Sequence, residues 1–361
     1  MTATVGAVGL VAQRGGAGMA DTSTGAADGT AAGLVGGAAW GESSGAPSGT
    51  DRAGTREDPR LLTLESDAWQ LGVLPATGAS LAFGRILVDD RWVDLLRPTR
   101  PTVYGSSEKC ASFPLVPWSN RIRDGMLTFR GRTWRLAHHA ADGTAMHGAV
   151  LDHTWDVVEQ TGCKVDLAFD SRGLTGVNFP WQFRSELTYS VCGGTLTVTT
   201  TVENVDTEPF PAGFGHHPYF QRSLTPGGAD AYLQVPTERG YVLDRATAVG
   251  PAGDVPVRAD YRVARPLGHA FVDDVLTDRQ PGEPVRITYP DQGVEVRIDA
   301  DDAYEHLVVY VPRRRAYFAV EPVTNVNGGF ALHDAGVPGT GVFVLEPGES
   351  RTGVFSVSAA V

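Results

Sequence analysis

The chain has 361 residues and is 42% hydrophobic, which is enough to bury a sizeable core in one large domain or two smaller ones. Its net charge is −12, from 42 acidic and 30 basic residues, and Arg313–Arg315 is the one basic block, so nucleic acid is excluded as an expected partner. No apolar run is long enough to span a membrane and the N-terminus does not resemble a signal peptide, so we expect a cytoplasmic protein that makes no use of a membrane.

Residues 1–58 are dominated by Gly, Ala, Ser and Thr and offer little apolar surface except Trp40. Such a segment cannot offset the conformational entropy that it would lose on ordering. The composition therefore predicts a disordered tail over residues 1–58 and one folded domain over residues 59–361.

Short apolar or alternating runs follow one another from Leu61 to the C-terminus. They are LLTLES, WQLGVLP, SLAFGRILVD, MLTFRGRTWRLA, KVDLAFD, FRSELTYSV, TLTVTTTVEN, VRITYP, VEVRIDA, HLVVYVP, AYFAVEP, GVFVLEP and TGVFSVSAA. Turn residues join several of them, as at Arg130-Gly131, Gly193-Gly194 and Asp291-Gln292-Gly293. Strand after strand without a long helical period predicts an all-β fold of antiparallel sheets stacked as a sandwich.

The three cysteines, Cys110, Cys163 and Cys192, have neither CxxC nor zinc-finger spacing. An odd number without such spacing argues against a disulfide framework and against a zinc site. We expect reduced, structural thiols.

Three histidines stand in unusual settings: His147 in MHGAVLDHTW, and the adjacent His216 and His217 in FGHHPYF. Taken singly, such a histidine is more often structural or exposed than functional. Neighbouring strand residues face opposite sides of a sheet, so only one of His216 and His217 can point into a given cleft. This orientation argues against a metal site that uses both.

Two further segments carry polar groups next to predicted strands. Glu321 closes the run AYFAVEP before a Thr-Asn-Val-Asn-Gly-Gly loop, where a carboxylate is placed for acid–base work or simply exposed at the surface. Asn120 and Arg121 in PLVPWSNRIRDG can bind sugar hydroxyls or form a polar loop with a surface ion pair. The aromatic side chains Trp118, Tyr219 and Phe220 can support a sugar ring or fill the core.

In this order and context, the segments PLVPWSNRIRDGMLTFRGRTWRL, MHGAVLDHTW, FGHHPYF, DDVLTD, FAVEPVTNVNGGF and LEPGES resemble the aldose 1-epimerase (galactose mutarotase-like) family. The resemblance runs from about Leu61 to the C-terminus. It implies a galactose mutarotase-like supersandwich that uses no cofactor and no metal. It also implies a small free aldose of the glucose or galactose type as substrate, and a monomer or homodimer.

The resemblance also implies a role for each matching residue. Glu321 corresponds to the general base and His217 to the general acid of the family. The corresponding sugar contacts are His147, Arg121, Asn120 beside Arg121, and Asp273 of DDVL, with the adjacent Asp274 as an alternative. With Glu321 ionised and His217 protonated in the active form, we expect a bell-shaped dependence of activity on pH.

Three other functions remain open from the sequence. A hexose-6-phosphate 1-epimerase would use the same acid and base with an arginine cluster, for which Arg313–Arg315 is the candidate. A carbohydrate-binding sandwich would use the same polar groups without turnover. A metal-dependent enzyme would use His147, His217 and Glu321 as ligands.

Overall fold

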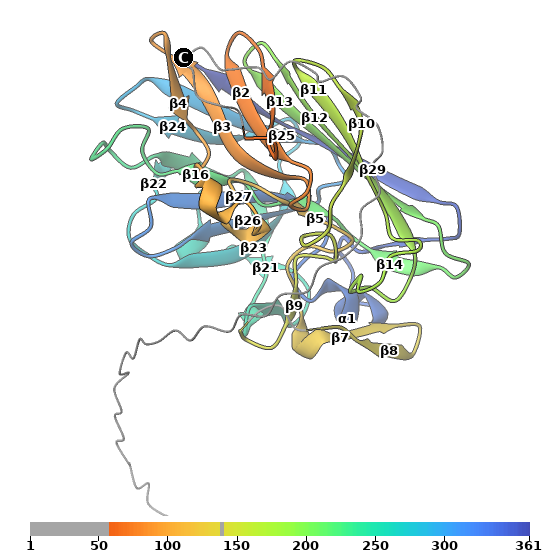
Figure 1. The fold of residues 1–361 in the computed structure, drawn as a ribbon. Helices are drawn as coiled ribbons and strands as arrows, with labels where there is room; N and C mark the ends of the chain where they lie inside the picture. The colour runs from red at the N-terminus through yellow and green to blue at the C-terminus, as the bar shows by residue number, and fades with distance from the viewer. Residues whose placement is uncertain (1–57, 138–140) are drawn as a thin grey trace, which may run out of the picture. The chain divides into compact units, whose positions relative to one another are not determined.

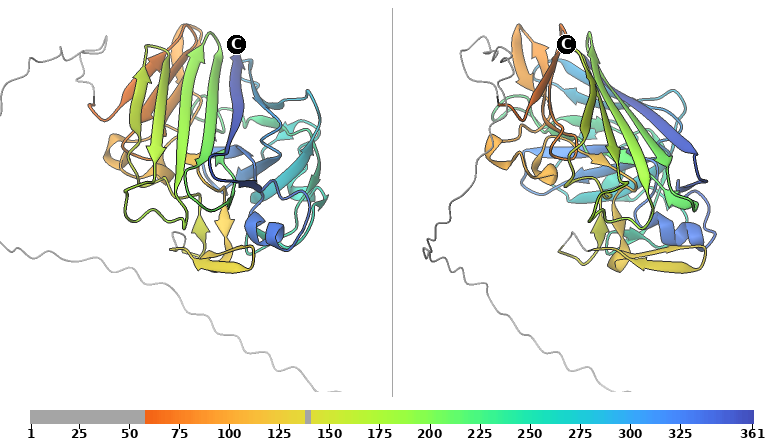
Figure 2. Two further views of the ribbon diagram at one scale, coloured as in Figure 1. Left: turned by 90° about the vertical axis from the view of Figure 1, so that its right-hand side faces the viewer. Right: turned by 45° about the vertical axis from the view of Figure 1, so that its right-hand side comes forward.

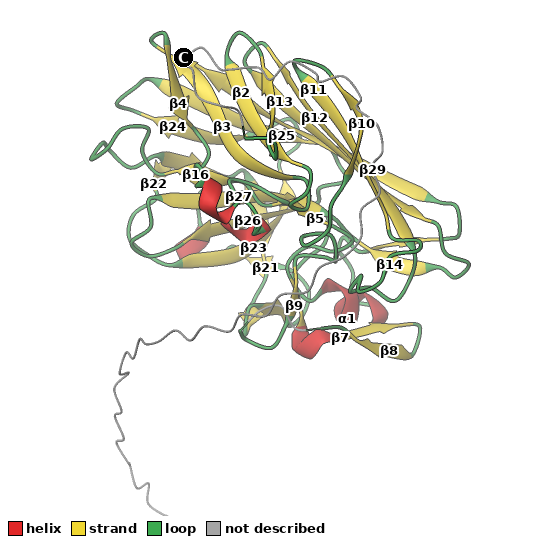
Figure 3. Cartoon of the chain, viewed as in Figure 1, coloured by secondary structure: helices red, strands yellow, loops and turns green. Residues whose placement is uncertain are grey.

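The computed structural model describes residues 58–137 and 141–361. The tail expected over residues 1–58 lies, except for Asp58, outside the described residues. Within the described part the chain is built from strands in antiparallel sheets with a few short helical turns, which confirms the all-β prediction (Figures 1 and 3). None of the helices in these two ranges is long and apolar enough to cross a bilayer.

Two large sheets form the two layers of a sandwich (Figure 2). The nine-stranded sheet has the order β10 (Asp156–Gln160), β11 (Lys164–Asp170), β12 (Phe183–Cys192), β13 (Thr195–Asn204), β29 (Ser350–Ala360), β25 (Val294–Ala300), β24 (Val285–Tyr289), β17 (Tyr232–Gln234) and β22 (Arg265–Pro266). The eight-stranded sheet has the order β21 (Gly253–Asp254), β18 (Thr237–Gly240), β23 (Val272–Arg279), β26 (His306–Val311), β27 (Tyr317–Val323), β15 (Gly215–His216) and β5 (Pro114–Leu115), and β16 (Tyr219–Gln221) also pairs with β27.

Smaller elements flank these layers. A four-stranded sheet contains β1 (Leu62–Glu65), β2 (Trp69–Leu74), β3 (Ser80–Val88) and β4 (Arg91–Asp94). The two-stranded pairs are β6 (Arg121–Ile122) with β9 (Ala145–Met146), β7 (Met126–Phe129) with β8 (Arg132–Arg135), β14 (Phe210–Ala212) with β28 (Phe343–Leu345), and β19 (Leu243–Asp244) with β20 (Thr247–Ala248). Helix α1 (Gly329–Asp334) packs on β7, and single 3₁₀ turns cover Pro101–Val103, Ser107–Lys109, Arg123–Gly125 and Val257–Ala259.

The predicted turns explain the hairpins. In the β7–β8 hairpin Phe129 pairs with Arg132, and the two residues between them, Arg130 and Gly131, both have positive φ, at 50° and 74°. Such a two-residue turn matches the right-handed twist of the flanking strands. Gly193-Gly194 is also a two-residue turn, between the paired residues Cys192 and Thr195 of β12 and β13, with Gly193 at φ 51°.

The two faces of the eight-stranded sheet pack against different apolar clusters. On one face Val309, Val320 and Leu276 belong to the main core that lies between the two large sheets. On the other face Val308 and Val275 belong to a second, smaller apolar cluster. Because directly paired residues of antiparallel strands point to the same side, the register places polar side chains of β23, β26 and β27 together over this second cluster.

One boundary differs from the sequence prediction. Strand β27 does not end at Glu321 but continues to Val323, and the loop that follows enters helix α1 at Gly329. Glu321 is therefore a residue of a central strand, paired with Val308 of β26, and its backbone is fixed by the sheet.

Candidate active site

His217 and Glu321 meet on the face of the eight-stranded sheet that points away from the main core. Nε2 of His217 lies 3.1 Å from Oε1 of Glu321, and the two residues are 6% and 2% exposed. Glu321 comes from β27, and His217 directly follows β15, which pairs with β27 through Gly215 and Val323. Two ionisable groups that are distant in sequence thus form one buried pair.

His216 and His217 point to opposite sides of the sheet, as strand geometry predicts. Nδ1 of His216 lies 2.9 Å from Oγ of Ser112 and its Nε2 lies 3.1 Å from the Tyr189 hydroxyl, within the main core. The ring of His216 also packs against Phe355 of the nine-stranded sheet. His216 is therefore a core residue, and His217 faces the site.

The β6–β9 pair brings Arg121 and His147 to the same place. Arg121 pairs with Met146, and His147 follows directly, with its backbone N–H donating to the Asn120 carbonyl at 2.9 Å. Asn120 and His147 both adopt positive φ, at 56° and 63°, which is uncommon outside glycine. Gly148 follows at φ 85°, where an added Cβ would lie 2.0 Å from the Val116 carbonyl oxygen.

The side chain of Arg121 is held from two sides. Its Nη1 donates to Oδ1 of Asn120 at 3.0 Å, and its Nε donates to Oδ2 of Asp142 at 3.0 Å. Asp142 is fixed in turn by the Thr144 hydroxyl, which donates to Oδ1 at 2.6 Å. The oxygen of the Asn120 side chain is thus used to orient the guanidinium, and Asp142 is a supporting residue that the sequence did not indicate.

The structure separates the two adjacent aspartates of β23. Asp273 pairs with Tyr310 of β26, on the same face as Glu321. Asp274 points to the other side, where it is fully buried and accepts two hydrogen bonds from Arg258 at 2.7 and 2.6 Å. Asp273 is therefore the aspartate on the site face, and Asp274 is a structural ion-pair partner.

Burial dominates the electrostatics of the site. It raises the pKa of Glu321 well above its ordinary value, an effect that Asp273 increases and Arg121 opposes. Burial also lowers the pKa of His217 well below its ordinary value, with smaller contributions from His147 and Arg97. Burial and, secondarily, Arg121 lower the pKa of His147 to about 3, so this imidazole is neutral throughout the physiological range.

These shifts leave the His217–Glu321 pair with one proton between its two groups around neutral pH. Adding a second proton creates a buried net positive charge, and removing the last one creates a buried net negative charge, and both are costly. Moving the single proton from the carboxyl to the imidazole changes no net charge and needs no solvent. The pair can therefore switch between a neutral form and a carboxylate–imidazolium form.

Three buried polar atoms in this cluster have no hydrogen-bond partner within the described chain. They are Nδ1 of His147, Nδ1 of His217 and Oε2 of Glu321. Buried polar atoms in native proteins are nearly always paired, so unpaired donors and acceptors at one place indicate a surface that binds a polar ligand. Hydroxyl groups, which both donate and accept, complement such a set.

Aromatic rings enclose His217. The ring centroids of Tyr219 and Phe113 lie 4.3 and 4.9 Å from that of His217, and Tyr310 lies edge-on at 6.5 Å. Of the aromatic side chains singled out in the sequence, only Tyr219 reaches the site. Trp118 and Phe220 are fully buried in the main core.

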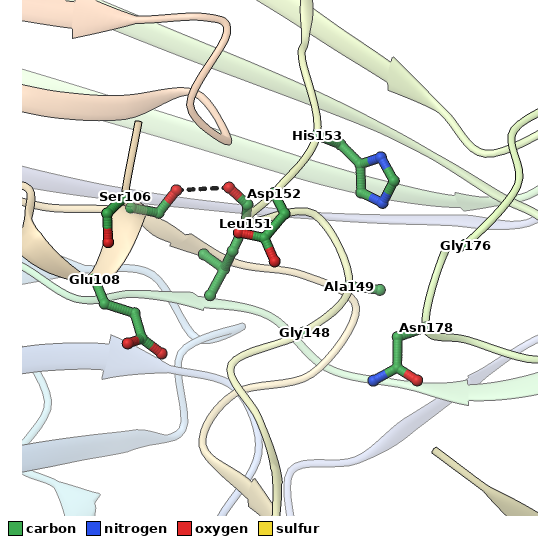
Figure 4. Close-up of a pocket in the computed structure, with 10 residues that line it drawn as sticks. Ser106, Glu108, Gly148, Ala149, Leu151, Asp152, His153, Gly176 and Asn178 are labelled. Carbon is green, nitrogen blue, oxygen red and sulfur yellow. Dashed lines mark hydrogen bonds between the residues drawn. The ribbon is translucent and has the colours of Figure 1, made fainter. Parts of the chain in front are cut away.

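A separate hollow of about 340 Å³ lies between the segments 106–108, 148–153 and 176–178 (Figure 4). It is lined by the carboxylates of Glu108 and Asp152 and by the His153 ring, and none of the six predicted site residues lines it. The Asn178 amide at its edge is already bonded to the backbone of Ala137, at 2.8 and 3.1 Å. This hollow shares only the Gly148 segment with the site.

Across residues 58–137 and 141–361, no group of three or more His, Cys, Asp or Glu side chains lies close enough together to hold a metal ion. The chemistry available at the site is that of an acid–base pair flanked by hydrogen-bonding groups. The six residues predicted from the sequence lie on one side of the eight-stranded sheet: Glu321, His217, His147, Arg121, Asn120 and Asp273.

The chain is similar to proteins of one family. The model of the aldose 1-epimerase family matches residues 73–358. Two proteins of Escherichia coli K12, YihR and YphB, are each 25% identical, over 67% and 75% of this chain and 77% and 91% of their own lengths.

Solved structures show the same fold. A putative aldose 1-epimerase from E. coli K12 matches with a TM-score of 0.69 and 22% identity, covering 83% of this chain and 98% of its own. A galactose mutarotase-like protein from Clostridium acetobutylicum matches with a TM-score of 0.71 and 19% identity, covering 83% and 95%. The fold is thus the galactose mutarotase-like β-sandwich, and the chain belongs to the aldose 1-epimerase family.

Proposed function

We propose that this protein is a cofactor-independent aldose 1-epimerase that interconverts the α and β anomers of a free aldose. The observation that carries the proposal is the buried contact of 3.1 Å between His217 and Glu321. In a cyclic sugar, the O1 hydroxyl and the ring oxygen are bonded to the same carbon. An acid and a base that stand side by side can therefore reach both oxygens at once.

The reaction follows from the carboxylate–imidazolium form of the pair. Glu321 takes the proton from the O1 hydroxyl, and His217 delivers a proton to the ring oxygen, so that the bond from C1 to the ring oxygen breaks and an aldehyde forms. Rotation about C1–C2 presents the other face of the aldehyde. Ring closure uses the same two groups with their roles reversed, and the pair ends with its original proton.

The neighbouring groups have a different task, which is to hold the sugar. Neutral His147 and Arg121, which is fixed by Asn120 and Asp142, offer hydrogen bonds to hydroxyl groups. Asp273 on β23 offers an acceptor for them. The backbone positions of Arg121 and His147 are set by the β6–β9 pair, so these contacts are preorganised.

A panel of freshly dissolved sugars tests the proposal. NMR detects the exchange between α and β anomers of glucose and galactose directly, and we expect the protein to accelerate it with and without a chelator. Binding of sugars without acceleration would instead identify a carbohydrate-binding sandwich. Acceleration confined to a hexose 6-phosphate would identify the phosphosugar enzyme.

The first prediction separates binding from chemistry. His147→Ala and Arg121→Ala are each expected to raise KM about tenfold or more with a smaller effect on kcat, because hydroxyl contacts act on the bound sugar and the transition state alike. Steady-state kinetics with α-D-galactose measures both constants. Loss of kcat alone, at unchanged KM, would contradict the binding role.

The second prediction concerns pH. Because burial disfavours both a second proton on the pair and the loss of the last one, we expect a bell-shaped profile with a broad plateau. As the pKa of His217 is depressed, the acid limb should lie below the ordinary histidine value of 6.5. An acid limb centred at 6.5 or above in the initial rate of anomer exchange would show that the pair is not held as the structure has it.

A further inference from the structure

Arg97 is a partly buried cation without a carboxylate partner. It lies between β4 and the turn Pro101–Val103, and among the described ion pairs it has none. Its Nη2 donates to the backbone carbonyls of Cys110 and of Glu108, the latter at 3.2 Å, and its buried Nε has no hydrogen-bond partner in the described chain. By contrast, the buried Arg222 is paired with Asp230 at 2.7 Å. Since withdrawing an unpaired charge from water is costly, the position of Arg97 calls for an explanation.

Aromatic faces take the place of a counter-ion. The guanidinium carbon of Arg97 lies 3.8 Å from the ring centroid of Tyr219 and 4.6 Å from that of Tyr317. The backbone N–H of Arg97 also donates to the Tyr219 carbonyl at 2.8 Å. Arg97 thus holds Tyr219 by both its main chain and its ring, and cation–π attraction stabilises the stack.

The ring of Tyr219 also contacts the candidate active site. The ring of Tyr219 lies 4.3 Å, centroid to centroid, from the ring of His217, with 39° between the planes. The ring of Tyr219 therefore contacts both Arg97 and His217, and Nε2 of His217 faces Glu321.

We propose that Arg97 is a positioning residue for the proton donor: acting through Tyr219, it fixes the His217 ring against Glu321 and places a permanent positive charge behind that ring. The proposal rests on the acid–base function proposed above. Positive charge behind an imidazolium favours release of its proton toward the substrate, which is the step that ring opening requires.

The other ionisable groups near His217 do not supply such a charge. His147 and His216 are neutral because burial lowers the pKa of each to about 3. Burial also raises the pKa values of Tyr219 and Tyr310 above their ordinary values, so both phenols stay protonated. Glu321 shares its proton with His217, and Arg121 acts on the His147 and Glu321 side of the site.

Two substitutions test the proposal. Arg97→Met keeps much of the side-chain volume but removes the charge, so both limbs of the pH profile should move up by about 0.5–1 pH unit, with kcat about 3–10-fold lower. Arg97→Lys keeps the charge without the planar stack, so the limbs should stay in place while kcat falls about threefold. Arg85→Met is the matched control, because Arg85 also lies over a ring, that of Phe83 at 4.4 Å, and should change neither quantity.

A second measurement does not depend on turnover. NMR titration of the His217 imidazole should show its midpoint at higher pH in Arg97→Met than in the unsubstituted protein. An unchanged midpoint and unchanged limbs in a folded Arg97→Met protein would overturn the proposal. If Arg97→Met does not fold, a wild-type kcat in Arg97→Lys would overturn it. If the unsubstituted protein does not accelerate anomer exchange but the His217 midpoint still moves to higher pH in Arg97→Met, the result counts against the proposed function alone.

Discussion

Replacing Glu321 with glutamine is expected to lower kcat for anomer exchange by about 10²-fold or more, the usual magnitude of a lost proton transfer. Glutamine keeps the shape and the hydrogen-bonding capacity of the side chain but cannot accept the O1 proton at neutral pH. It also removes a buried ionisable group without creating a cavity, so the protein should remain folded. The measurement is the rate of anomer exchange by NMR, together with the thermal unfolding midpoint.

Sugar binding should survive this substitution, because Glu321 acts on bonds that change only in the transition state. Calorimetric titration with galactose would show this as a dissociation constant within about threefold of the original value. Glu186→Gln on β12 is the control, since Glu186 is exposed and its ion pair with Arg184 is of the kind that contributes little. Near-normal turnover in Glu321→Gln would remove Glu321 from the mechanism.

His217→Asn should have an effect of similar size for the complementary reason. Asparagine can still donate a hydrogen bond from nearly the same place, but it cannot deliver a proton to the ring oxygen. We expect kcat to fall by about 10²-fold or more and the acid limb of the pH profile to change shape, because the remaining carboxyl of Glu321 then titrates without its partner.

The exposed His269 provides the control for this experiment, and His269→Asn should leave both kcat and the pH profile unchanged. The double variant Glu321→Gln, His217→Asn should be little slower than either single variant, because the two groups act as a unit. Full additivity of the two losses would show that each group works independently of the other.

Local sequence patterns were sufficient for most of the strands. The run KVDLAFD predicts a strand, and the structure has β11 there. Every second residue of β11 is buried, as expected for a strand with one face packed on a core. The two-residue turns at Arg130-Gly131 and Gly193-Gly194 likewise follow from local chemistry. By contrast β10 is exposed along its whole length, so it has no hydrophobic alternation by which it could have been found.

The composition of the site was predictable only in part, because proximity in a sheet depends on register. The choice between Asp273 and Asp274 needed the pairing of Asp273 with Tyr310, which no local pattern reveals. Arg97 gave no signal because its role depends on the rings of Tyr219 and Tyr317, which are distant in sequence. The proposed roles of His217 as acid and Glu321 as base came from the family resemblance and not from local physics.

The back-to-back arrangement of His216 and His217 has a consequence for engineering. His216 is fixed in the core by Ser112 and Tyr189, and the next residue along the chain, His217, is the proposed proton donor. Repacking this part of the interior for heat resistance would therefore change catalysis as well. A search for stabilising substitutions is better directed to β10, the exposed edge strand of the nine-stranded sheet, where Val157 and Val158 lie at the surface, because the candidate site lies on the other large sheet.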